Sequence, residues 1–156
     1  FSERTVVEPA LKKAEQSLSP SVAIELPDGR IVVGRASGLM TSCSSAVLNA
    51  IKMLADIADD ELLLSPAVLE PITRLKKEVL HRDKFRLNLA DVLTALSICA
   101  ADDETVNKAY LKLTLLKDCE AHSSCMLPEI DMSMLRKLGV NVTCEPEFAT
   151  KELYGI

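Results

Sequence analysis

Aromatic residues are scarce in this chain, which limits what its core can be made of. They form 3% of the 156 residues, and Trp is absent. Hydrophobic residues reach 48% and charged residues 26%, a balance typical of a globular protein. A chain of this length typically buries about two-thirds of its unfolded surface. We therefore expect a single domain, residues 1–156, with a core of Leu, Ile, Val, Ala and Met.

Long apolar runs and an excess of positive charge are also missing. No run approaches the roughly 18 residues that a membrane-spanning helix needs. The formal net charge of −5 gives no general attraction for phosphate backbones. We expect neither a membrane nor a nucleic acid as partner. One basic stretch runs against this average, and we interpret it as a solvated helix face rather than an anion-binding patch: Arg74, Lys76, Lys77, Arg82, Lys84 and Arg86.

The cysteine content indicates a reducing compartment. Five cysteines are an odd number, without the density of a disulfide scaffold, and the sequence lacks a signal peptide. These features predict reduced thiols in a cytoplasm. The chain starts at Phe1 and not at Met, which indicates a fragment, a processed product or a trimmed chain.

Hydrophobic periodicity and turn residues predict an alternation of helices and strands. Expected helices cover about 8–19, 46–54, 71–80, 88–101, 104–116 and 132–138. Expected strands cover 21–26, 31–34, 62–64, 120–127 and 140–143, the first two forming a hairpin around Pro27-Asp28-Gly29-Arg30. This order predicts the α/β class, with a three-layer α/β/α sandwich around a mostly parallel sheet that carries an N-terminal antiparallel hairpin.

Several runs of the sequence resemble one known family. They are LPDGRIV (26–32), LNLADVL (87–93), ALSICAA (95–101), CEAHS (119–123) and RKLGVNVTCEP (136–146). Together they resemble the bacterial family called domain of unknown function 1846, over nearly the whole chain. Family members are longer, and this chain resembles only about their last third. The resemblance therefore implies that the chain is the carboxy-terminal part of a longer protein, whose remainder is its first partner.

The resemblance implies a sandwich similar to the cytidine deaminase topology, but no activity. Zinc deaminases need a His or Cys followed two residues later by Glu at one helix start, and Pro-Cys-x-x-Cys at the next. The corresponding positions here read TSCSS (41–45) and SPAV (65–68). Neither supplies the ligands, so the sequence argues against zinc deamination, since a fold does not fix a function.

The strongest candidate site is the segment from Cys119 to Cys125, which holds His122, Glu120, Ser123 and Ser124. An imidazole can act as a base near neutral pH, Glu120 is a candidate acid, and Ser123 and Ser124 are candidate partners for the imidazole or for a substrate. The alternative is a buried His that a backbone carbonyl satisfies. Because side chains alternate along a strand, the two cysteines face away from His122, so no metal site is expected.

The second candidate is the small-residue loop that precedes the helix at 46–54. Its hydroxyl-bearing residues are Thr41, Ser42, Ser44 and Ser45. Free N–H groups at a helix N-terminus favour anions, so this loop is a candidate site for a small anionic ligand. Ordinary helix capping explains the same composition, and a lone Gly38 without Lys argues against a P-loop.

The third candidate lies where the last strand ends, at Thr143 and Glu145. Ligands of open α/β sheets gather outside the carboxyl ends of strands, which makes Glu145 a candidate acid and Thr143 a candidate ligand-binding residue. A plain strand exit at Pro146 is the alternative.

We therefore predict a ligand-binding or accessory domain of a larger cytoplasmic protein, in which His122, the Ser42 loop and Glu145 converge on one edge of the sheet. Two alternatives stay open. One is a transferase or hydrolase domain with His122 as base, and the other is a structural or homo-oligomerising module. No cofactor can be named from the sequence.

Overall fold

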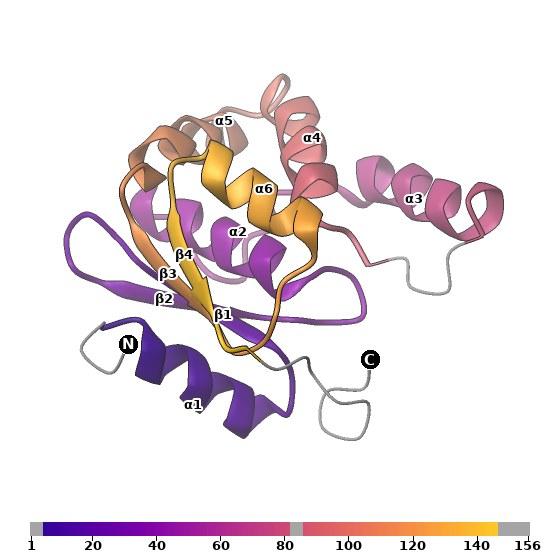
Figure 1. The fold of residues 1–156 in the computed structure, drawn as a ribbon. Coiled ribbons are helices and arrows are strands. Elements are labelled where there is room, and N and C mark those ends of the chain that lie inside the picture. Colours follow the sequence, from indigo (N-terminus) through magenta and orange to yellow (C-terminus); the bar gives the residue numbers. More distant parts are fainter. Residues whose placement is uncertain (1–4, 82–85, 147–156) are drawn as a thin grey trace.

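The computed structural model describes residues 5–81 and 86–146, which form a mixed α/β fold (Figure 1). Its four strands are β1 (Ser21–Glu25), β2 (Ile31–Arg35), β3 (Glu120–Ser123) and β4 (Asn141–Cys144). Its six α-helices are α1 (Val7–Ser17), α2 (Ser42–Leu54), α3 (Pro66–Arg74), α4 (Leu89–Ala100), α5 (Glu104–Leu111) and α6 (Glu129–Lys137). A π-helical turn, η1 (Leu75–Val79), continues α3, and a 3-10 turn, η2 (Lys112–Leu116), continues α5.

The four strands form one sheet in the order β2-β1-β3-β4. Strand β1 is antiparallel to both β2 and β3, and only β3 and β4 are parallel. The expectation of a mostly parallel sheet is therefore wrong. The expected strand at 62–64 does not form, because Leu63 and Leu64 bury their side chains from a loop that leads into α3.

The β1–β2 hairpin forms as predicted. The N–H of Leu26 donates to the carbonyl of Arg30 at 2.8 Å and closes the turn. Gly29 has a φ of +89°, a conformation that costs glycine little. Asp28 also pairs with the guanidinium of Arg30 at 2.6 Å. The hairpin fixes β2 as an edge strand beside β1.

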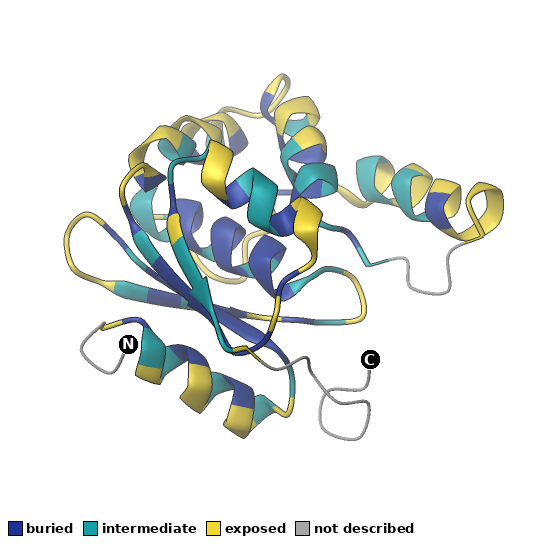
Figure 2. Cartoon of the chain, viewed as in Figure 1, coloured by how far each residue is buried: buried dark blue, intermediate teal, exposed yellow. Residues whose placement is uncertain are grey.

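Helices cover both faces of the sheet (Figure 1). On one face, α1 packs Val6 and Ala10 against Ala23 of β1. On the other face, α2 lies in the larger core, against the alternate residues Val22 and Ile24. Figure 2 shows α2 as the most continuously buried helix, with α4, α5 and α6 around it.

Helix α2 approaches β2 closely because residue 34 is glycine. A Cβ atom at Gly34 would lie 2.1 Å from the backbone nitrogen of Ala46, far inside van der Waals contact. The backbone of β2 therefore packs directly against the backbone of the first half of α2. This close approach also brings the outer face of α2 to the open edge of the sheet.

The chain from Pro66 onward departs from the expectation of a turn followed by a helix at 71–80. Helix α3 begins at Pro66 and runs through Pro71. Pro71 removes the hydrogen bond to the carbonyl of Ala67, but Ala67 is exposed and water can satisfy that carbonyl. Figure 1 shows α3 and η1 extending away from the body of the domain.

Candidate functional site

The first candidate site joins three side chains at the carboxyl ends of β3 and β4. Nδ1 of His122 lies 2.7 Å from the hydroxyl of Thr143, its neighbour in the β3–β4 register. Nε2 of His122 lies 2.7 Å from Oε2 of Glu145, just beyond β4. The imidazole has no exposed surface, whereas the side chain of Glu145 is 36% exposed. We call these three residues the His122 cluster.

Each member of the His122 cluster is placed by the backbone. The N–H of Glu145 donates to the carbonyl of Ser123 at 3.0 Å, which extends the parallel ladder by one step past β4. This bond holds Glu145 beside the end of β3. An ionised carboxylate only accepts hydrogen bonds, so Nε2 of His122 carries a proton and donates to it. In the neutral imidazole, Nδ1 then accepts from the hydroxyl of Thr143.

The other polar residues of this segment serve the fold. The hydroxyl of Ser123 donates to the carbonyl of Cys125 at 2.7 Å. The hydroxyl of Ser124 accepts from the N–H of Ser21 at 2.9 Å, which ties β3 to β1. Glu120 lies at the opposite end of β3, where it lines a shallow surface hollow with Arg136, Asn141 and Thr143. The structure thus unites His122, Thr143 and Glu145, but not Glu120, Ser123 or Ser124.

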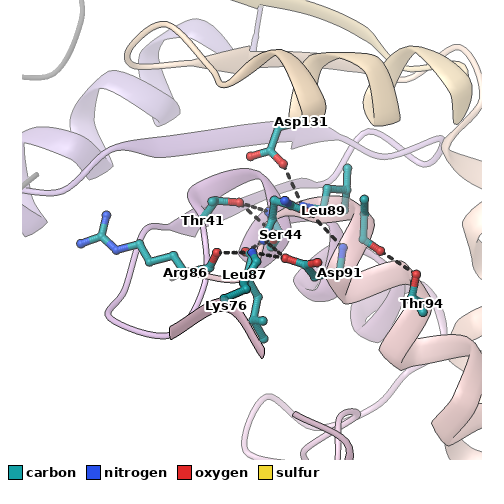
Figure 3. A network of polar contacts seen from close by, with 11 residues as sticks. Thr41, Ser44, Lys76, Arg86, Leu87, Leu89, Asp91, Thr94 and Asp131 are labelled. Carbon is teal, nitrogen blue, oxygen red and sulfur yellow. Dashed lines mark hydrogen bonds and ion pairs between the residues drawn. The ribbon is translucent and has the colours of Figure 1, made fainter. Parts of the chain in front are cut away.

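The second candidate site is the polar network at the start of α2 (Figure 3). Thr41 caps α2 by accepting from the N–H of Ser44 at 3.3 Å, and the two hydroxyls are 2.9 Å apart. The hydroxyl of Ser44 donates to the carbonyl of Leu87, which also accepts from the N–H of Thr41. Ser42 is buried, and Ser45 lines a groove between α2 and β2. Capping therefore uses the hydroxyl of Thr41, whereas the hydroxyl of Ser44 binds the carbonyl of Leu87.

Acidic groups lie beside this helix start. Oδ1 of Asp131 on α6 accepts from the N–H of Leu89 at 2.8 Å, while Oδ2 is buried without a hydrogen-bond partner in the described chain. Burial raises the pKa of Asp131, an effect that the Leu89 N–H and the nearby Thr41 hydroxyl partly oppose. A second carboxylate, Asp91, forms the capping box of α4 with Asn88. Two carboxyl groups here disfavour a bound anion.

One cation of the basic stretch is buried, contrary to the expected solvated face. The ammonium of Lys76, in η1, pairs with the carboxylate of Asp91 and donates to the carbonyl of Arg86 at 2.9 Å (Figure 3). The side chain of Lys76 is 7% exposed. Arg82 and Lys84 lie outside the described residues. No sequence pattern distinguishes Lys76 from its exposed neighbour Lys77; only the distant Asp91 does.

The His122 cluster and the start of α2 lie on opposite faces of the sheet. His122 is paired in register with Ala23, which packs on α1, whereas its neighbour Ala121 belongs to the core that contains α2. Alternation along β3 therefore points the imidazole toward α1 and away from the Ser42 loop. The expectation that these stretches converge on one site is wrong.

No arrangement suited to a metal ion occurs in residues 5–81 and 86–146, where no three His, Cys, Asp or Glu side chains are grouped for coordination. Burial raises the pKa of the Cys119 thiol, and raises that of Cys43 well above its ordinary value. Both effects favour the protonated thiol over the thiolate that binds metals or attacks substrates.

Within residues 5–81 and 86–146, no helix combines the length and the apolar character needed to span a membrane.

A groove beside β2 is a further feature of the structure, which no sequence pattern predicts. It has a volume of about 400 Å³ and runs between β2, the outer face of α2 and the loop before α3. Its polar and charged lining includes Lys13, Arg35, Ser45, Lys52 and Glu61. Of the expected ligand-binding residues, only Ser45 lines it.

Comparison with known proteins places the chain in a family. The C-terminal domain of the family called domain of unknown function DUF1846 matches residues 2–154. A UPF0371 protein of Clostridium botulinum (strain Eklund 17B / Type B) is 43% identical over 161 residues, which cover 98% of this chain and 32% of that protein. A UPF0371 protein of Clostridioides difficile (strain 630) is 50% identical over 135 residues, 86% of this chain and 27% of that protein. The chain spans about a third of the length of these relatives. It belongs to the DUF1846 family, as a C-terminal domain.

Proposed function

We propose that this chain is a ligand-binding accessory domain of a longer protein, and that Glu145 is the group that meets the ligand. One observation carries the proposal: the carboxylate of Glu145 is fixed 2.7 Å from Nε2 of His122 while its side chain stays 36% exposed. Oriented polar groups at the carboxyl ends of strands are typical of ligand sites in α/β folds. The fully buried imidazole cannot touch a ligand, so His122 is a positioning residue.

The chemistry of the His122 cluster limits the ligand class. An ionised carboxylate accepts hydrogen bonds and attracts cations, so Glu145 suits a small metabolite with a hydroxyl or ammonium group. Holding the carboxylate in one rotamer before binding lowers the entropy lost on binding. The rest of the longer protein would supply the other walls of this site.

The catalytic alternative, a transferase or hydrolase in which His122 acts as a base, has less support. A general base must reach the proton that it removes, and this imidazole has no exposed surface and a partner at each ring nitrogen. Homo-oligomerisation stays a prediction.

We also infer a three-layer α/β/α arrangement of the cytidine deaminase type, and a cytoplasmic location. The first is supported by α1 on one face of the sheet and α2 on the other. The second is supported by five free cysteines. Deamination itself is not proposed.

A thermal-shift screen of the full-length protein tests the ligand proposal. The probes are nucleosides, sugar phosphates, amino acids and organic acids. We expect at least one class to raise the Tm of the wild type, and this shift to disappear in Glu145→Gln but persist in Glu129→Gln, which changes an exposed carboxylate on α6. An equal shift in wild type and Glu145→Gln, or no shift with any probe, contradicts the proposal.

A further inference from the structure

The groove beside β2 is lined by one face of α2. Ser45, Leu48, Asn49 and Lys52 follow one another at the spacing that keeps side chains on the same side of a helix. The side-chain amide of Asn49 donates to the carbonyl of Val33 at 3.1 Å, which fixes this face of α2 against the open edge of β2. The groove is therefore framed by two elements of the core fold.

Lys52 is the most unusual residue of this lining. It is 8% exposed, and its ammonium donates to the backbone carbonyl of Asp59 at 2.6 Å. No carboxylate of residues 5–81 and 86–146 forms an ion pair with it. Buried charges in proteins are normally paired, because an ammonium out of water is costly without an anion. Lys52 thus lines the groove as a buried cation without an ion-pair partner among the described residues.

Two further cations line the same groove from other elements. Arg35 ends β2, and Lys13 comes from α1 on the far side of the sheet edge. Among the described residues of the lining, Glu61 is the one carboxylate. The groove therefore carries an excess of positive charge in a chain whose formal net charge is −5. Such a local reversal of sign attracts an anion.

The remaining walls of the groove are aliphatic. They include Leu39, Met40, Leu62, Leu63, Leu64 and Leu69. Leu62 is 76% exposed, so part of this apolar wall faces solvent in the free domain. A volume of about 400 Å³ lies within the range of small-molecule sites. Apolar walls together with three cations fit a ligand that is itself divided into an apolar part and an anionic head.

We propose that this groove binds an aliphatic carboxylate, with its head toward Lys52 and Arg35 and its chain against the leucines before α3. The site is separate from the His122 cluster and independent of the function proposed for it. It also gives the anion expected from the sequence a different location, on the outer face of α2 and not at the N-terminus of that helix. At the N-terminus of α2, the carboxyl groups of Asp131 and Asp91 would repel a bound anion.

Calorimetric titration of the full-length protein with octanoate tests this proposal, with octylamine as the probe of opposite charge. We expect saturable octanoate binding, no octylamine binding, and affinity reduced about tenfold in Lys52→Met, the usual effect of losing one charge-assisted hydrogen bond. Lys12→Met, which removes an exposed charge outside the groove, is the control and should bind like the wild type.

Arg35→Met keeps the test decisive if Lys52→Met fails to fold, because Arg35 is exposed and its loss leaves the core intact. We expect it to weaken octanoate binding about threefold or more. Glu145→Gln should leave octanoate binding unchanged, which separates this proposal from the previous one. No saturable binding to the wild type, or equal binding by wild type and Arg35→Met, overturns the proposal.

Discussion

Nε2 of His122 and Oε2 of Glu145 lie 2.7 Å apart although 23 positions separate the two residues. One partner is wholly buried and the other is partly exposed, so the pair links the interior of the domain to its surface. The exposed carboxylate cannot rotate freely without breaking a bond to a group that has no access to water. Its position is therefore set by the core.

Replacing the imidazole should destabilise the chain. His122→Ala removes a buried ring, leaves a cavity, and takes one hydrogen-bond partner from each of Thr143 and Glu145. We expect a loss of about 3 kcal/mol in the free energy of unfolding. Glu145→Gln keeps an acceptor oxygen opposite Nε2, and should cost about 1 kcal/mol or less. Urea denaturation of both variants checks this, and equal losses would show that the ring is not structurally required.

Gly34→Ala should disrupt the contact between α2 and β2. The new Cβ would lie 2.1 Å from the backbone nitrogen of Ala46, and a backbone atom cannot move aside as a flexible side chain can. We expect a loss of about 3 kcal/mol or more in the free energy of unfolding. Gly38→Ala is the matched control, because a Cβ there meets nothing within 4 Å. Similar denaturation midpoints for the two variants would refute the packing described here.

Lys76→Met tests the buried ion pair between η1 and α4. It leaves Asp91 without its cation in a largely buried site, and should cost about 3 kcal/mol. Arg74→Met breaks the neighbouring pair with Glu70, which is exposed on both sides, and should cost less than about 0.5 kcal/mol. Thermal unfolding of the two variants gives the comparison. A loss no larger in Lys76→Met than in Arg74→Met would contradict the assigned role of Lys76.

Asp131 should make stability depend on pH. Burial raises its pKa in the folded state above the ordinary value of 3.8, so the folded chain binds the proton more tightly than the unfolded chain. Its contribution to stability is therefore present in acid, and is lost as the pH rises from about 3.8 through the folded-state pKa. Asp131→Asn keeps an acceptor for Leu89 and cannot ionise. This variant should lack that loss and be more stable than wild type at neutral pH.

Denaturation of wild type and Asp131→Asn at a series of pH values measures this difference. The stability of the wild type relative to the variant should fall as the pH rises. A difference that stays constant across the series would mean that Asp131 ionises equally in the folded and unfolded states. A difference that grows in favour of the wild type would reverse the sign derived from its burial.

The local features of the fold were predictable from sequence where the chemistry is local. The helix that begins near Asn88 and the turn at Gly29 depend on residues close along the chain, and both form as expected. The direction of β3 was not predictable, because it depends on pairing with β1, about a hundred positions away. The apolar run that contains Leu63 and Leu64 predicted a strand. These two side chains are apolar because they are buried, and not because the run pairs with another strand.

The candidate site was predictable only in part, because its geometry also depends on contacts between residues distant in the sequence. His122 was identified from its imidazole chemistry, and Thr143 and Glu145 from their position where the last strand ends. The structure brings the three together. The assignment of the Ser42 loop to the same site was wrong, since strand alternation and the two faces of the sheet separate them. Lys52 and Asp131 stand out only by burial, which the sequence around them does not reveal.

The central claim, that a buried imidazole fixes the carboxylate of Glu145, can be tested by proton–nitrogen correlation NMR of the two histidines. His81 is exposed and serves as the internal reference. We predict that His122 carries its proton on Nε2, and that this proton exchanges with water far more slowly than those of His81. Glu145→Gln should accelerate that exchange. A proton on Nδ1 alone, or exchange as fast as in His81, would contradict the account.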